Sequence, residues 1–350
     1  MHAAEPPPTP ERADPEAMPP LPKVLLHEHL DGSLRVATLF ELLRARRLAV
    51  PAGDAEGLAR WFDANAHAGS LTKYLEGFAL TVAAMASPEA MERVAYEAAE
   101  DARADGAVLA EFRIAPLLFE AHGIPGDVAV EALLAGLARS ALPCGLIVCA
   151  MRDLPEAETE RALDLALGFA GRGVVGFDLA GAELGHPATR HARALARARE
   201  AGLPLTLHAG EADTAERVLD AARLGARRIG HGVRLADALA DPERAHLVDE
   251  VKAHGVHLEV CPTSNVHTGA AASVAAHPIG ALWRAGLSLS YHTDNRLMSR
   301  ISHASEARAL QHEAGFTTAE LRAMAREAAR HSFLPEAARA AALRAIDAAA

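Results

Sequence analysis

The sequence predicts an α/β fold, a (β/α)8 TIM barrel with extra helices after strand 1. From residue 23 onward, short β-branched or Leu-rich runs alternate with long Ala-, Leu-, Arg- and Glu-rich stretches, which is typical of parallel strands joined by crossover helices. Eight such short runs occur, the strand number of this barrel. The length of 350 residues also suits one barrel with insertions.

The expected strands follow one another along the chain. They cover residues 24–29, 108–112, 146–150, 174–179, 205–208, 228–231, 257–260 and 287–291. The connection between the first two is too long for a single helix, so we expect several helices there, including a lid over the pocket around residues 61–78. The Ala-rich stretch from Ala337 predicts a final helix.

The chain ends and the cysteines indicate the domain plan and the compartment. We expect residues 21–350 to form a single barrel domain. Residues 1–20 are Pro-rich and lack the basic start and apolar core of a secretory signal, so we expect a disordered tail. Three irregularly spaced cysteines, Cys144, Cys149 and Cys261, argue against a disulfide framework and favour a reducing cytoplasm.

Composition excludes several classes of partner. Acidic residues outnumber basic ones by 46 to 35, and no basic cluster is interleaved with aromatic residues, which argues against a nucleic-acid partner. No apolar run approaches the roughly 20 residues that cross a bilayer, so we expect no membrane association. A small, uncharged substrate fits best, and the sequence leaves the oligomeric state open.

Histidines and acidic residues gather at the ends of four expected strands. His27 and His29 end the first strand, and the period of two places them on one face with Glu28 on the other. His208 ends the fifth strand, and Gly210 lets the chain double back toward Glu211. Each motif taken alone also fits a structural role: polar residues at a strand end, a buried histidine, or an acid in the first turn of a helix.

Two more strand ends complete the pattern. His231 ends the sixth strand between two glycines, and Asp294 follows the eighth. In βα barrels, functional groups come from the carboxyl ends of several strands, so these residues are expected to converge. Histidine and aspartate are zinc ligands, and a catalytic zinc needs three or four of them beside an open position. The pattern therefore predicts a zinc hydrolase.

Six motifs in order resemble the adenosine deaminase family of the amidohydrolase superfamily, from about residue 22 to the last helix. They are residues 26–33 (LHEHLDGS), 177–183 (FDLAGAE), 208–211 (HAGE), 228–232 (RIGHG), 261–265 (CPTSN) and 293–295 (TDN).

The resemblance implies a role for each site residue and one Zn2+ per subunit. The implied zinc ligands are His27, His29, His208 and Asp294, with Glu211 as proton donor and His231 orienting the attacking water. The implied contacts to a purine nucleoside are His29, Asp31, Gly181 and Asn295. The implied reaction is hydrolytic deamination of adenosine and 2'-deoxyadenosine to inosine and ammonia: zinc-activated hydroxide adds to purine C6 while N1 is protonated.

Two positions depart from the commonest family pattern. Many members carry aspartate where this chain has Asn295, and they donate a hydrogen bond to purine N7 only while that acid is protonated. An amide donates without taking up a proton, so we expect purine recognition to be preserved and one titrating group to be lost. Asn295 could instead cap a helix. The second departure is Ala182, where an acid is frequent, and it leaves the exact nucleoside open.

Three rival functions remain open from the sequence. A binuclear amidohydrolase would need a carboxylated lysine near the fourth strand, but the chain has only Lys23, Lys73 and Lys252. A related deaminase acting on adenine, N6-methyl-AMP or 6-aminodeoxyfutalosine would keep every catalytic residue. A non-catalytic binding protein would be expected to have lost a ligand or the proton donor, and none is missing.

Overall fold

Eight parallel strands form one sheet in the computed structural model of the protein, and their order follows the sequence. The structure describes residues 21–66 and 71–349, and for residues 71–76 it describes the backbone alone. The expected tail at residues 1–20 lies outside the described residues. The strands are β1 (Lys23–Leu25), β2 (Ala107–Ile114), β3 (Cys144–Met151), β4 (Val174–Ala180), β5 (Leu205–Ala209), β6 (Arg228–His231), β7 (His257–Val260) and β8 (Leu289–Tyr291).

The sheet closes on itself beyond β1 and β8. Glu28 and Asp294 form a parallel bridge, in which the His29 N–H donates to the Asp294 carbonyl (2.8 Å) and the Asp294 N–H donates to the His27 carbonyl (3.0 Å). This closure and the eight-strand order confirm the predicted barrel.

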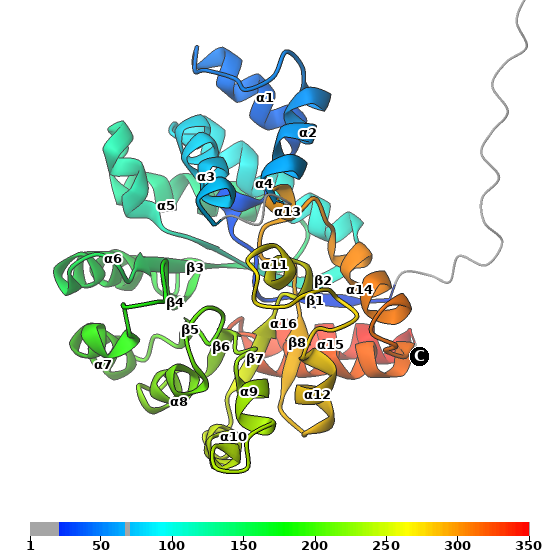
Figure 1. Cartoon of the computed structure of the whole chain (residues 1–350). Helices are drawn as coiled ribbons and strands as arrows, with labels where there is room; N and C mark the ends of the chain where they lie inside the picture. Colours follow the sequence, from blue (N-terminus) through cyan, green and yellow to red (C-terminus); the bar gives the residue numbers. More distant parts are fainter. Residues whose placement is uncertain (1–20, 67–70, 350) are drawn as a thin grey trace, which may run out of the picture.

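Helices surround the sheet (Figure 1). They are η1 (Leu30–Gly32), α1 (Val36–Ala45), α2 (Ala55–Ala66), α3 (Leu71–Met85), α4 (Pro88–Ala104), η2 (Pro116–His122), α5 (Gly126–Ala138), α6 (Glu156–Phe169), η3 (Ala188–His191), α7 (Ala192–Glu200), α8 (Ala215–Arg223), α9 (Leu235–Leu239), α10 (Ala245–Ala253), α11 (Pro262–His267), α12 (Ile279–Arg284), α13 (Arg296–Ser299), α14 (His303–His312), α15 (Thr318–His331) and α16 (Glu336–Ala348). The helices from α1 to α4 confirm the expected insertion after strand 1, and α16 confirms the final helix. The lid role of α2 and α3 stays a prediction. No helix in the described part of the chain is long and apolar enough to cross a membrane.

Local sequence sets several helix starts. Ser87, Ser302 and Thr317 precede α4, α14 and α15, and each side chain accepts a backbone N–H from the first turn. Apolar faces then pack inward: α15 contacts β1 and β8, while α16 contacts α15 and β2. One buried cluster joins Val24 and Leu26 of the first strand segment to Ala and Ile side chains of these two helices.

The centre of the barrel is charged. Five fully buried side chains alternate in sign and form what we call the charge column: Glu111, Arg228, Glu259, Arg113 and Asp178. Successive members lie 2.5 to 2.7 Å apart at their charged atoms. Burying such charges is tolerable only because each has an opposite partner.

The chain between α15 and α16 covers the charge column at Glu111 and Arg228, on the side of the barrel where the strands begin. The Ser332 hydroxyl and the Phe333 N–H donate to Glu111 at 2.5 and 2.6 Å. The Phe333 ring lies against the Arg228 guanidinium, 3.7 Å from carbon to ring centroid. The column therefore runs from this covered end toward the carboxyl ends of the strands.

Candidate active site

Four side chains converge at the carboxyl ends of the strands: His27, His29, His208 and Asp294. One ligand atom from each lies within 4.8 Å of all the others. The Nε2 atoms of His29 and His208 are 3.3 Å apart, and Asp294 Oδ1 lies 3.3 Å from His27 Nε2 and 3.5 Å from His29 Nε2. The structure thus brings together the four residues expected to bind zinc.

The spacing of these atoms fits a zinc ion. Ligand atoms about 2.05 Å from zinc at tetrahedral angles lie about 3.3 Å from one another. Three short separations in the cluster are 3.3 to 3.5 Å. In addition, His27 Nε2 is buried without a hydrogen-bond partner, as expected of an atom whose partner is an ion. The donor set of three imidazoles and one carboxylate also suits zinc.

Neighbouring side chains orient the ligands. His27 Nδ1 bonds Glu259 Oε2 at 2.9 Å, and His208 Nδ1 lies 3.0 Å from an oxygen of Asp178. Each bond turns the Nε2 atom of its ring toward the centre of the cluster. The Ser264 hydroxyl donates to Asp294 Oδ2 at 2.6 Å, which leaves Oδ1 to face the histidines.

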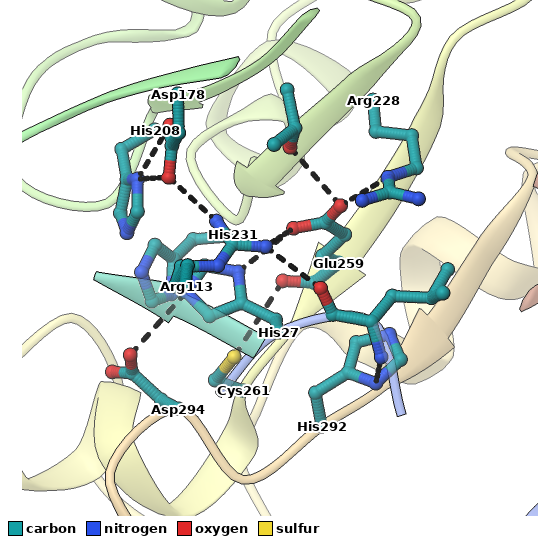
Figure 2. Close-up of polar contacts among 12 residues, drawn as sticks. His27, Arg113, Asp178, His208, Arg228, His231, Glu259, Cys261, His292 and Asp294 are labelled. Carbon is teal, nitrogen blue, oxygen red and sulfur yellow. Dashed lines mark hydrogen bonds and ion pairs between the residues drawn. The ribbon is translucent and has the colours of Figure 1, made fainter. Parts of the chain in front are cut away.

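The charge column reaches these orienting groups (Figure 2). Arg113 lies between Asp178 and Glu259, and Glu259 lies between Arg113 and Arg228. Burial alone would raise the pKa of Glu259, but the two guanidinium groups outweigh it and hold that pKa well below its usual range. Burial is likewise outweighed at Asp178 by His208 and Arg113, so its pKa is lowered. Both carboxylates are therefore charged when they contact the ligand histidines.

Glu211 and His231 lie beside the four-residue cluster. Glu211 Oε2 is 3.5 Å from His231 Nε2, and the rings of His231 and His27 have centroids 5.0 Å apart. Glu211 Oε1 accepts hydrogen bonds from the Thr268 hydroxyl (2.8 Å) and the Asn265 amide (3.2 Å). With Oε1 held by two donors, Oε2 is the oxygen left for proton transfer.

A chain of hydrogen bonds fixes the tautomer of His231. The Ile279 N–H donates to His277 Nδ1 (3.1 Å), so His277 carries its proton on Nε2 and donates it to Asn265 Oδ1 (3.2 Å). The Asn265 amide NH2 then faces His231 Nδ1 (3.1 Å) and must donate to it. Burial lowers the pKa of His231, so the neutral ring carries its proton on Nε2. His231 therefore presents an N–H donor toward Glu211 and the cluster.

The backbone turns sharply where these side chains enter the site. His231 and Asp294 have left-handed φ angles of 66° and 58°, which non-glycine residues adopt at an energetic cost. Gly210 has φ of 70° at the turn before Glu211, as expected from the sequence. At Gly230, a Cβ would lie 2.9 Å from Cε1 of His27, so only glycine permits this approach to a ligand ring.

The expected substrate contacts surround the same end of the barrel. Asp31 lies in η1 directly after His29, and burial raises the pKa of its carboxyl to about 7. Gly181 follows β4, and the neighbouring Ala182 is exposed. Asn295 occupies the N-cap position of α13, but its side chain makes no capping hydrogen bond. Asn295 thus takes the N-cap position that the alternative expected, without a capping hydrogen bond from its side chain. Its role toward a nucleoside stays a prediction.

A second grouping of possible ligands among the described residues fits a metal poorly. His257, Glu327 and His331 bring ligand atoms within 4.8 Å of one another. The two imidazole rings are stacked, however, with an interplanar angle of 12°, so their in-plane lone pairs do not converge. Both nitrogens of His257 are also bonded to Ser288 and Ser290.

Comparison with known proteins identifies the family. The sequence matches the adenosine deaminase family over residues 22–349. It is 41% identical over 328 residues to the adenosine deaminase of Mycobacterium tuberculosis, covering 90% of each chain. The chain belongs to the adenosine deaminase family. This confirms the resemblance drawn from the six motifs, and family membership makes the chain an enzyme rather than a binding protein.

Solved structures with this deaminase fold share the whole barrel. The adenine deaminase of Arthrobacter aurescens matches with a TM-score of 0.84 and 26% identity, covering 94% of this chain and 98% of that one. The N6-mAMP deaminase of arabidopsis matches with a TM-score of 0.82 and 25% identity, at 94% and 98% coverage. An amidohydrolase from Burkholderia ambifaria with bound Zn matches with a TM-score of 0.81 and 25% identity, at 94% and 91% coverage.

Several site residues of this deaminase were not singled out from the sequence. They are Asp178, Glu259, Ser264, Asn265 and Thr268, which hold the ligands and Glu211 in place. Two of them had a usable signal: Asp178 and Glu259 are lone acids inside otherwise largely apolar strands. A buried acid of this kind needs a partner, which points to the site.

Proposed function

We propose that this protein catalyses the zinc-dependent hydrolytic deamination of adenosine and 2'-deoxyadenosine to inosine and ammonia. The observation that carries the proposal is the position of Glu211 and His231 beside a cluster of three histidines and one aspartate. That arrangement offers a metal site, a proton donor and a hydrogen-bond donor for water next to one another. The curated relative named adenosine deaminase, at 41% identity, supports the same reaction.

Each proposed step is assigned to a side chain. One zinc ion per subunit, held by His27, His29, His208 and Asp294, would supply a water of lowered pKa. The N–H on His231 Nε2 would hold that water for addition to purine C6. Addition would push electron density onto N1, and Glu211 would deliver a proton to this nitrogen from Oε2. The C6–N bond would then break as the proton of the added hydroxyl passes to the amino group, so that ammonia leaves and the C6 carbonyl of inosine forms.

The nucleoside contacts belong to the same proposal. His29, Asp31, Gly181 and Asn295 follow the carboxyl ends of β1, β4 and β8, where barrel enzymes bind substrates. We assign Asn295 to purine N7, since its amide donates at any pH.

A second candidate is deamination of a related 6-aminopurine compound: adenine, N6-methyl-AMP or 6-aminodeoxyfutalosine. The similar solved structures of an adenine deaminase and an N6-mAMP deaminase favour keeping this candidate. These substrates need the same chemistry at C6 and N1 and differ only in what the pocket wall must accept.

The test is a substrate panel with zinc-loaded protein. We expect ammonia release, followed by the ultraviolet shift that accompanies loss of the 6-amino group, to be fastest with adenosine and deoxyadenosine. Adenine, AMP, N6-methyl-AMP and 6-aminodeoxyfutalosine complete the panel. A faster rate with one of the last four would replace the proposed substrate.

A variant tests the proton donor. Glu211→Gln should keep its zinc, since Glu211 is not a ligand, and should lose at least about 100-fold in kcat because the amide cannot deliver the proton. Glu216→Gln, on α8 and paired with Arg244 at the surface, is the matched control and should keep its kcat. A fully active Glu211→Gln protein would show that the donor is another group.

A further inference from the structure

We infer that Glu183 is a positioning residue for Glu211, acting through the backbone of the β5–α8 connection. The inference rests on the proposed function, in which Glu211 is the proton donor. The Glu183 carboxylate accepts hydrogen bonds from four consecutive backbone N–H groups, those of residues 210 to 213. Oε1 accepts from Gly210, and Oε2 accepts from Glu211 (3.0 Å), Ala212 (2.7 Å) and Asp213 (3.0 Å).

A charged acceptor is needed at this point. Four N–H dipoles converge on the carboxyl group of a residue that is only 7% exposed, so a neutral group would leave several donors without an adequate partner. Burial would raise the pKa of Glu183, but these N–H bonds, together with the nearby Arg152, outweigh burial and lower it. Arg152 also donates to the carbonyls of Leu179 and His208, which ties β4 to β5 beside the connection.

Glu211 is held both at its backbone, by Glu183, and at its side chain, by other residues. Glu183 fixes the backbone of Glu211, while Thr268 and Asn265 fix its carboxyl group. The four N–H groups belong to the segment between β5 and α8. They take no part in the hydrogen bonds between strands of the sheet or in those within α8. Arg234 holds the carbonyls of Gly210 (2.9 Å) and Glu211 (3.1 Å) through its backbone N–H and its Nε. Removing the Glu183 acceptor would therefore loosen the N–H side of the segment that carries the proton donor, without detaching the segment, and leave the barrel core intact.

The expected effect is on the chemical step. A displacement of about 1 Å in a reacting group costs on the order of 100-fold in rate. Glu183→Gln retains the shape of the side chain, but its NH2 group would face backbone donors and cannot accept from them. We expect kcat to fall about 10- to 100-fold, with KM and zinc content unchanged.

Two further variants complete the experiment. Glu183→Asp keeps the charge on a shorter side chain and should restore part of kcat. Glu156→Gln is the control, because Glu156 also accepts two backbone N–H groups, from Arg193 and Ala194, at the start of α7, and it should keep its kcat. All four proteins are assayed with adenosine after zinc loading, and kcat is expressed per folded, zinc-containing molecule.

A binding measurement separates positioning from a structural role. A stable tetrahedral analogue of the addition product should lose affinity for Glu183→Gln by the factor lost in kcat/KM, whereas inosine should bind unchanged. A lower melting temperature with unchanged kcat and analogue affinity would overturn the inference. If Glu183→Gln does not fold, Glu183→Asp carries the test: a lowered melting temperature with unchanged kcat and unchanged analogue affinity in that variant overturns the inference as well. Wild-type protein that releases no ammonia from any substrate would instead overturn the proposed function itself.

Discussion

Replacing Glu259 by glutamine should weaken both the fold and the metal site, by amounts that the contacts define. Glu259 Oε2 contacts Arg113 at 2.5 Å and His27 at 2.9 Å, and Oε1 contacts Arg228 at 2.5 Å and Thr206 at 3.0 Å. A glutamine has one oxygen and one NH2 group, so in either orientation an NH2 group faces a guanidinium. Breaking a buried ion pair in this way costs about 3–5 kcal/mol of unfolding free energy.

The same change reaches the metal through His27. The charge that strengthens the bond to His27 Nδ1 is lost in both orientations of the amide. Loss of such an orienting contact typically lowers metal affinity about 10- to 100-fold, which is about 1.4–2.7 kcal/mol. For a chain of this length, with an unfolding entropy of about 2.1 cal/mol/K per residue, the loss of stability lowers Tm by about 4–7 °C.

Glu111→Gln separates the two effects. Glu111 pairs with Arg228 at 2.7 Å in the same charge column but makes no contact with a ligand histidine in the described structure. Stability is measured by denaturant unfolding in a chelator, and zinc affinity by competition with a chelating dye. We expect both variants to be less stable and only Glu259→Gln to bind zinc more weakly. Equal zinc affinity in the two variants would refute the link from Glu259 to the metal.

Two further predictions concern titrating groups. Glu306 is buried with its pKa raised to about 7, so the folded protein holds a proton that the unfolded chain releases near pH 4.5, and stability should fall as pH rises from about 4.5 through 7. Glu306→Gln keeps one acceptor for Thr263 and should remove on the order of 3 kcal/mol of this decline in unfolding free energy. The measurement is denaturant unfolding at pH 5 and pH 8. Parallel curves of unfolding free energy against pH for the two proteins would contradict the prediction. Asn295→Asp should make KM for adenosine rise with pH, because the new carboxyl donates to the purine only while protonated; an unchanged pH dependence of KM would argue against Asn295 at purine N7.

The barrel and the proposed metal ligands could be predicted because their signals are local. Strand and helix periods repeat along the chain, and His27, His29, His208 and Asp294 each lie at or just after the end of a strand that is visible in the sequence. Parallel strands then bring these ends together without any knowledge of individual contacts.

The supporting contacts could not be predicted because they join distant residues. Asn265 is 34 residues from His231, and Thr268 is 57 residues from Glu211. The charge column had a partial signal, since Glu111 and Arg113 are two positions apart in one apolar strand and therefore share a face. Pairing them with acids and bases of β4, β6 and β7 required the register of the closed sheet.

The cover formed by Phe333 gives the segment between α15 and α16 an influence on the charges at the centre of the barrel. Without this ring, water would reach Arg228 and weaken every electrostatic attraction between there and His27. Replacing Phe333 by alanine would therefore lower the stability of the barrel centre without touching any ligand of the site.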